Sequence, residues 1–69
     1  MSETLGDALP REMTRVRDEV MPFYIEIGPP GQFALAMMMA DLDAATRALA
    51  SGDVIAMLRI YEKLKGYST

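Results

Sequence analysis

The sequence predicts an all-α protein: a kinked N-terminal helix over about 8–27, followed by an antiparallel hairpin of two helices over about 32–50 and 53–65. Two observations predict this class. Apolar residues recur every three or four positions in all three segments, which is the repeat of one helix face. No segment alternates apolar and polar residues as a half-buried strand does. The 69 residues form one small domain, and we expect residues 1–6 and 67–69 to fray.

An apolar stripe identifies the first helix. Its members follow one another at steps of four, three, four, four and three residues: Leu9, Met13, Val16, Val20, Tyr24 and Ile27. Asp7 is the expected N-cap, and Pro10 falls in the first turn, where its missing N–H is tolerated. Arg15 and Glu19 have the spacing of an ion pair on the outer face. Pro22 removes a backbone donor and clashes with the preceding turn, so it predicts a kink or a break.

Gly28 and the two prolines after it mark the end of the first helix, because glycine adopts the left-handed cap and proline cannot continue a helix. The second helix opens after Gly31. Its core stripe has steps of three, four, three and four: Leu35, Met38, Leu42, Ala45 and Leu49. Residues 33–40 are apolar on every side, and a helix that is apolar all round is buried all round. One neighbouring helix covers only one face, so this run predicts a second subunit.

The composition also favours association. A chain of this length buries only about 60% of the surface of its unfolded form, so its core alone is marginal. It has no cysteine and no histidine, which excludes disulfides and ordinary zinc sites. We therefore expect a homo-oligomer. Five residues of the second helix are its predicted interface: Phe33, Met37, Met38, Met39 and Leu42.

Two questions about this interface stay open in the sequence. For Phe33 a core position is the favoured interpretation, and a partner or ligand site is the alternative. The three adjacent methionines fit a fixed contact between subunits, or an adaptable surface for another protein, because thioether side chains repack easily.

The third helix has clear signals at both ends. Gly52 suits a left-handed C-cap of the preceding helix, and Asp53 suits the N-cap of the next. The expected core positions are Val54, Met57, Leu58, Tyr61 and Leu64. Lys63 and Lys65 complement the helix dipole in the last turn, and Gly66 closes the helix. Because the loop is so short, the second and third helices must be antiparallel.

The side chains needed for catalysis are scarce. Acid–base and nucleophilic catalysis rely on His, Cys or paired carboxylates. Asp41 and Asp43, two positions apart on a helix, point about 200° away from each other and cannot share a metal. The sequence therefore predicts a protein that is not an enzyme and has no cofactor or metal.

The expected location follows from three features. The polar segment 1–7 is no signal peptide, and cysteine is absent. The longest apolar run has eight residues, whereas a bilayer span needs about 20. These features predict a soluble, cytoplasmic protein without membrane contact.

The basic residues suggest an anionic ligand. At four-residue spacing Arg11 repels Arg15 and Arg59 repels Lys63, and a bound anion would relieve both repulsions. Backbone N–H groups at the start of the second helix are a further anion site, and Tyr61 could stack on a base. The candidate ligand-binding residues are Arg11, Arg15, Gly31, Gln32, Phe33, Arg59, Tyr61 and Lys63. Solvated helix faces and a rigid turn are the alternative. The net charge of −3 argues against a general nucleic-acid binder.

The segment Ile27-Gly-Pro-Pro-Gly-Gln-Phe33, followed by a hairpin through Leu64, resembles small helical proteins of phage and prophage genomes. Some proteins of this kind block a host defence complex, and others sequester cyclic nucleotide signals as oligomers. The resemblance implies an anti-defence protein that holds a phosphorylated or cyclic nucleotide at its subunit interfaces.

Two other functions compete with this one. The alternative is an interaction module that docks on a partner protein, such as a host protein, through its Met-rich apolar surface. The third is a DNA-binding helix-turn-helix over residues 34–65. It is disfavoured because its recognition helix would begin with Asp53-Val-Ile-Ala-Met rather than with the polar residues that reach base edges.

Overall fold

The computed structural model describes residues 3–69, and these residues form four α-helices. The helices are α1 (Leu5–Arg15), α2 (Met21–Glu26), α3 (Gln32–Ser51) and α4 (Val54–Lys65). A π-helical turn, η1 (Val16–Val20), joins α1 to α2, and a 3-10 turn, η2 (Pro29–Gly31), precedes α3. No strand occurs in the described residues, so the predicted all-α class is confirmed.

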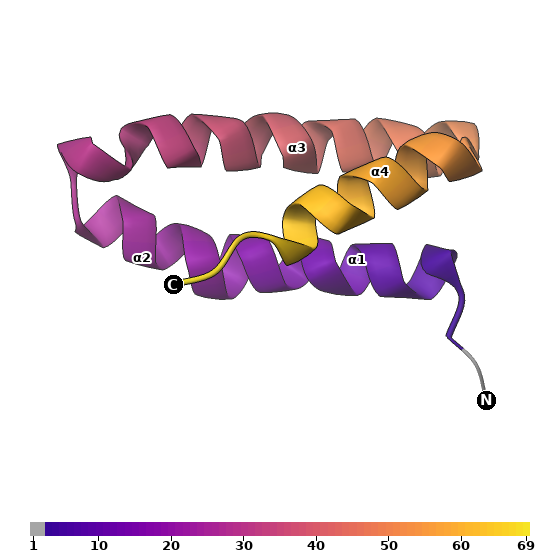
Figure 1. Ribbon diagram of the computed structural model, residues 1–69, viewed down its shortest axis with the longest axis horizontal. Helices are drawn as coiled ribbons and strands as arrows, with labels where there is room; N and C mark the ends of the chain where they lie inside the picture. Colours follow the sequence, from indigo (N-terminus) through magenta and orange to yellow (C-terminus); the bar gives the residue numbers. More distant parts are fainter. Residues whose placement is uncertain (1–2) are drawn as a thin grey trace.

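Figure 1 shows a rod made of α1, η1 and α2 that lies alongside α3 and runs in the opposite direction. Helix α4 returns from the end of α3 and crosses obliquely toward α1, packing against both helices. The predicted hairpin is therefore confirmed. Because α4 has 12 residues and α3 has 20, α4 ends near the middle of the molecule. One half of the molecule thus has three helices, whereas the half formed by α2 and the start of α3 has two.

The first helix begins earlier than the sequence predicts. Thr4, not Asp7, is the N-cap: its Oγ1 accepts a hydrogen bond from the Asp7 backbone N–H over 3.2 Å and donates one to Asp7 Oδ2 over 2.8 Å. Leu5 packs against the core, which holds the first turn in place, and the apolar stripe did not include it. Residues 4–6, which we expected to fray, belong to this capped turn. Residues 1–2 lie outside the described part of the chain.

Pro22 is accommodated by a change of helix type. The π-helical turn Val16–Val20 lies directly before Met21, whose backbone N–H donates to the Val16 carbonyl in the five-residue step of a π-helix. Pro22 then falls in the first turn of α2, where no backbone N–H is needed. The predicted interruption at Pro22 is confirmed, and the chain absorbs it without leaving the helix.

The predicted helix ends around the hairpin are also confirmed. Gly52 has φ 70° and ends α3 in the left-handed conformation. Asp53 caps α4, because its side chain accepts a hydrogen bond from the Ala56 backbone N–H over 3.1 Å. The predicted end of α2 before the prolines is confirmed, but the left-handed cap predicted for Gly28 is not: it has a positive φ of 79° with ψ −146°, outside the left-handed helical region.

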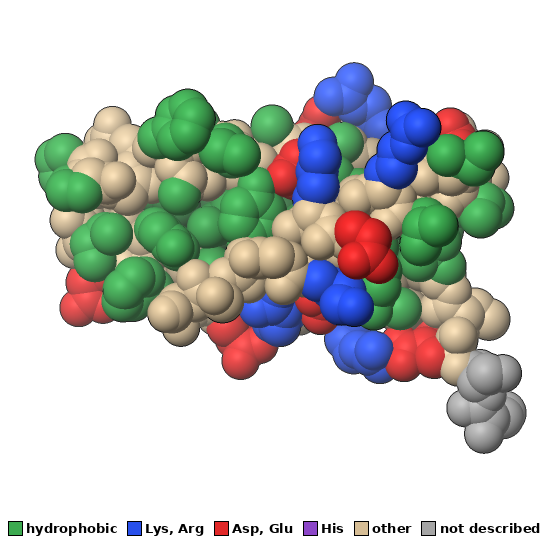
Figure 2. All heavy atoms as spheres, in the orientation of Figure 1, with side chains coloured by type: hydrophobic (Ala, Val, Ile, Leu, Met, Phe, Trp, Pro, Cys, Tyr) green, Lys and Arg blue, Asp and Glu red, His purple; other side chains and the backbone are tan. Residues whose placement is uncertain are grey.

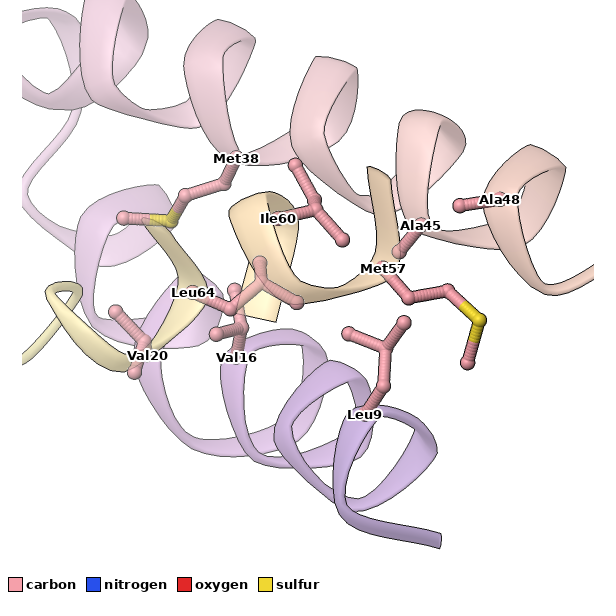
Figure 3. Packing of buried hydrophobic residues seen from close by; sticks show 9 residues of the cluster. All are labelled: Leu9, Val16, Val20, Met38, Ala45, Ala48, Met57, Ile60 and Leu64. Atoms are coloured by element: carbon pink, nitrogen blue, oxygen red, sulfur yellow. The ribbon is translucent and has the colours of Figure 1, made fainter. Parts of the chain in front are cut away.

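Figure 3 shows the buried core between the rod, α3 and α4. Its members are Leu9, Val16, Val20, Met38, Ala45, Ala48, Met57, Ile60 and Leu64. Two predicted core positions of α4 are wrong, because Val54 is 65% exposed and Leu58 is 52% exposed, whereas Ile60 is buried. Helix α4 crosses two helices at once, so the face that carries Met57, Ile60 and Leu64 turns toward them. Val54 and Leu58 are left on the solvent side.

Candidate functional site

Large apolar side chains are exposed at the two-helix end of the molecule. We call this surface the apolar end, and its residues are Phe23, Ile25, Ile27, Phe33, Met37 and Met39. Between 44% and 78% of each of these residues is accessible. In Figure 2 the half formed by α2 and the start of α3 shows mainly hydrophobic side chains, whereas the Lys and Arg side chains lie over the other half. The apolar end therefore exposes its side chains on more than one face, since Met37 and Met39 lie two positions apart on α3 and point about 200° away from each other.

The local sequence and the length of α4 together produce the apolar end. No charged residue occurs between Glu26, the last residue of α2, and Asp41, so the turn and the first half of α3 are uncharged. The positive φ of Gly28 reverses the chain and brings these segments together. Helix α4 ends before it reaches them, so no third helix covers their outer faces.

The structure divides the predicted oligomer interface. Phe33, Met37 and Met39 are exposed, whereas Met38 is fully buried and Leu42 is half-buried. Met38 therefore belongs to the core of the protomer and cannot contact a partner there, which corrects its assignment to the interface.

The expectation that Phe33 is a core residue was wrong, because 78% of it is exposed. Phe33 precedes Met38 by five positions, so the two side chains point about 140° apart on α3. Since Met38 faces the core, Phe33 faces solvent. The sequence analysis also missed Phe23 and Ile25, which α2 adds to the apolar end. The sequence contained a signal for their exposure, because both are large apolar residues that lie off the core stripe of the first helix.

The side chain of Arg15, a candidate ligand residue, already has hydrogen-bond partners within the protomer. Its Nη2 donates hydrogen bonds to the Leu64 carbonyl and the Tyr67 carbonyl, both over 2.9 Å. Its Nε contacts Glu12 over 3.2 Å, and this pair replaces the expected pair with Glu19. Arg15 is thus a clamp between α1 and the end of α4, because it donates to the Leu64 carbonyl in the last turn of α4 and to the Tyr67 carbonyl just after it.

The remaining candidate ligand residues lie in separate places. Arg11 pairs with Glu3 over 2.6 Å on the outer side of α1, and it lies near Tyr61 of α4.

Gly31 is buried, and its backbone N–H donates to the Gly28 carbonyl. A Cβ added to Gly31 would clash with the Tyr24 carbonyl oxygen. The exposed Gln32 and Phe33 follow Gly31 at the two-helix end of the molecule, whereas Arg59 and Lys63 lie on α4. The structure does not bring these groups together within one protomer.

Arg59 and Lys63 themselves stand together. Both line a groove of about 410 Å³ between α3 and α4, together with Ala44, Asp53, Ile55, Ala56 and Ile60. Among residues 3–69 neither cation has a carboxylate within ion-pair distance. Their repulsion, expected from the sequence, is therefore not relieved by another group of the same protomer.

The described residues define a small all-α protein whose distinctive features are two surfaces, the apolar end and the α3–α4 groove. Within residues 3–69 no group of three or more His, Cys, Asp or Glu side chains is placed to hold a metal ion. None of the described helices has the length and apolar character required to cross a bilayer. Comparison of the chain with protein families, with characterised proteins and with solved structures finds no match.

Proposed function

We propose that the protein is a non-enzymatic binding protein that works as a homo-oligomer, with the apolar end as the contact between its subunits. The exposure of six large apolar side chains at one end of the molecule is the observation that supports this proposal. Extended apolar patches on soluble proteins usually mark sites of protein contact. A second copy would bury this surface, and it would add apolar burial to a domain whose own core is small.

Sedimentation velocity at micromolar concentration tests the proposal. We expect the wild-type chain to sediment as an oligomer and the Phe33→Ser/Met39→Ser variant to sediment as a folded monomer. Leu58→Ser is the matched control, because Leu58 is 52% exposed but lies on α4, away from the apolar end. A wild-type monomer would contradict the proposal, and so would an oligomer that survives the double substitution but not Leu58→Ser.

A different protein could occupy the same surface. Met37 and Met39, which are 45% and 61% exposed, favour this second candidate because flexible thioether side chains adapt to unrelated partners. It predicts a wild-type chain that stays monomeric alone and forms a defined complex with a partner through the apolar end. The Phe33→Ser/Met39→Ser variant would lose that complex while keeping its helical circular dichroism spectrum.

The nucleotide-sequestering function of an anti-defence protein requires an arrangement between subunits. Phe33 belongs to the apolar end and Gln32 precedes it at the start of α3, whereas Arg59 and Lys63 lie on α4, so we propose that a ligand touches both groups across a subunit contact. Mono-, di- and cyclic nucleotides should then raise the melting temperature of the wild-type chain, because a ligand that binds only the folded state stabilises it. The monomeric double variant should show no such shift.

The helix-turn-helix alternative has no supporting observation. The exposed residues at the start of α4 are Val54 and Ile55, which are 65% and 67% accessible. Apolar side chains at this end of a recognition helix cannot form the hydrogen bonds that distinguish base pairs.

A further inference from the structure

A groove follows the seam between α3 and α4. It consists of three adjoining hollows of about 410, 400 and 340 Å³. Its first and third hollows include no residue of the apolar end, whereas its second hollow includes Met37. Lys63 lines the first and second hollows, and Ala44 and Ala56 line the first and third. The three hollows therefore adjoin one another along the seam.

The first hollow combines small apolar side chains with longer exposed ones. Ala44 of α3 and Ala56 and Ile60 of α4 line it, together with Asp53 and the exposed Ile55, Arg59 and Lys63. Because alanines line both sides of the seam, the backbone of an incoming helix could come within the 8–10 Å that separates packed helix axes. A seam between two helices is also the usual place where a third helix packs in a bundle.

The unpaired charges of the groove are positive. Every arginine outside α4 is paired with a carboxylate: Arg11 with Glu3, Arg15 with Glu12, Arg17 with Asp18 and Arg47 with Asp43. Arg59 and Lys63 have no such partner among residues 3–69. The carboxylates that line the groove are already engaged, since Asp53 caps α4 and Asp41 accepts a hydrogen bond from Tyr67.

We propose that this groove binds an acidic amphipathic helix of a partner protein. The apolar face of that helix would lie on Ala44, Ala56 and Ile60. Two of its carboxylates, one turn apart, would pair with Arg59 and Lys63, which are themselves one turn apart on α4. The paired carboxylates would relieve the repulsion between the two cations.

Other occupants fit the groove less well. A free phosphate or a nucleic acid would gain nothing from the apolar walls, and the net charge of −3 opposes a polyanion. A second copy that contacted the groove through residues 27–40 would bring no carboxylate to Arg59 or Lys63. Exposed carboxylates elsewhere on the chain, such as Asp18 and Glu19, make self-association through the groove the outcome that the sedimentation of Lys63→Glu tests. This inference does not depend on self-association through the apolar end.

Two synthetic peptides of about 18 residues, long enough for five helical turns, provide the test. Both carry the same leucine stripe, and they differ only in having Glu or Lys beside it. Fluorescence anisotropy with the full chain should show binding of the Glu peptide and at least about tenfold weaker binding of the Lys peptide. Equal binding of the two peptides, or no binding of the Glu peptide at millimolar concentration, would overturn the proposal.

The chain offers a matched pair of charge reversals. Lys63→Glu and Lys65→Glu make the same change of charge two positions apart, but Lys65 lies over the Tyr61 ring, 5.3 Å from its centre, outside the groove. We expect Lys63→Glu to lower the affinity for the Glu peptide about tenfold. We expect Lys65→Glu to change this affinity less than about twofold. Equal losses would show general charge attraction and overturn the proposal.

Two further measurements identify the occupant. Ala44 is exposed, so Ala44→Phe should leave the circular dichroism spectrum unchanged and block the Glu peptide sterically. Lys63→Glu should leave the sedimentation of the chain unchanged. If Lys63→Glu abolished self-association, a second copy would be the occupant. If a DNA duplex bound in place of the peptide and Lys63→Glu abolished its binding, nucleic acid would be the occupant. Either result would overturn the proposal.

Discussion

The hydroxyl group of Tyr67 donates a hydrogen bond to Asp41 Oδ2 over 2.6 Å, which ties the end of the chain to the middle of α3. Two more contacts hold the same segment, because Arg15 donates to the Tyr67 carbonyl and the Tyr24 hydroxyl donates to the Ser68 carbonyl over 3.2 Å. Residues 67–69 were expected to fray. In the structure the first two of them have partners on the rod and on α3.

The contact between Tyr67 and Asp41 predicts a dependence of stability on pH. Burial of the Tyr67 ring, with the hydrogen bond to Asp41 and its charge, raises the pKa of the phenol from 10.0 to about 12. The folded state therefore keeps a proton that the unfolded state loses, so the contribution is complete below about pH 10 and disappears as the pH rises toward 12. We expect the difference in unfolding free energy between wild type and Tyr67→Phe, measured with urea, to shrink between pH 9 and pH 12. A constant difference across this range would contradict the assignment.

The clamp formed by Arg15 predicts a stability difference between two neighbouring arginines. Arg15→Ala leaves two carbonyls of the α4 end without their charged donor and should lower the unfolding free energy by about 2 kcal/mol. Arg15→Lys should recover only part of this, because one ammonium group cannot reproduce the planar fork. Arg17, which is exposed and paired only with the adjacent Asp18, is the control. Arg17→Ala should lower the unfolding free energy by less than about 0.5 kcal/mol. Equal costs in urea denaturation would rule out the clamp.

Two glycines should differ in the substitutions they accept. Gly28 has φ 79° and ψ −146°, a region that only glycine visits readily, whereas Gly52 has φ 70° and ψ 22°, where asparagine is tolerated. An added Cβ meets no atom within 4 Å at either position, so only the backbone conformation differs. Gly28→Asn should lower the unfolding free energy by about 2 kcal/mol, and Gly52→Asn should lower it by less than about 1 kcal/mol. Thermal unfolding should therefore give Gly28→Asn the lower melting temperature of the two variants. A lower melting temperature for Gly52→Asn would contradict the prediction.

Adjacent methionines of α3 should respond oppositely to the same substitution. Met38 is completely buried, and an unpaired carboxylate there costs several kcal/mol against a total stability of about 5 kcal/mol. Met38→Asp should therefore unfold the chain. Met37 is 45% exposed, so Met37→Asp should keep the helical circular dichroism spectrum. A folded Met38→Asp protein would show that Met38 is not part of the core.

The uncharged run after Glu26 allowed part of the apolar end to be predicted from the sequence, but its assignment was incomplete. Whether an apolar residue of such a run is buried depends on how far the neighbouring helix extends. Phe33 points away from the core and α4 stops short of it, so it is exposed, whereas Met38 points into the core toward Val20 and Leu64 (Figure 3). The position of Arg59 and Lys63 in one groove could be predicted only in part from the sequence. Their spacing on one helix shows that they are close, but the opposite wall of the groove comes from α3.

The all-α class and most helix ends follow from the local sequence, because they depend on short-range chemistry. Periodicity identifies a helix face, Gly52 can adopt the left-handed conformation, and Asp53 can accept a hydrogen bond from a backbone N–H three residues later. Which face α4 buries depends instead on the packing of whole helices: because α4 crosses two helices, Ile60 rather than Leu58 lies in the core. The same packing decides the role of Arg15, whose acceptors lie 49 and 52 residues away in the chain. Contacts over such distances depend on the crossing of whole helices, which no local pattern of residues specifies.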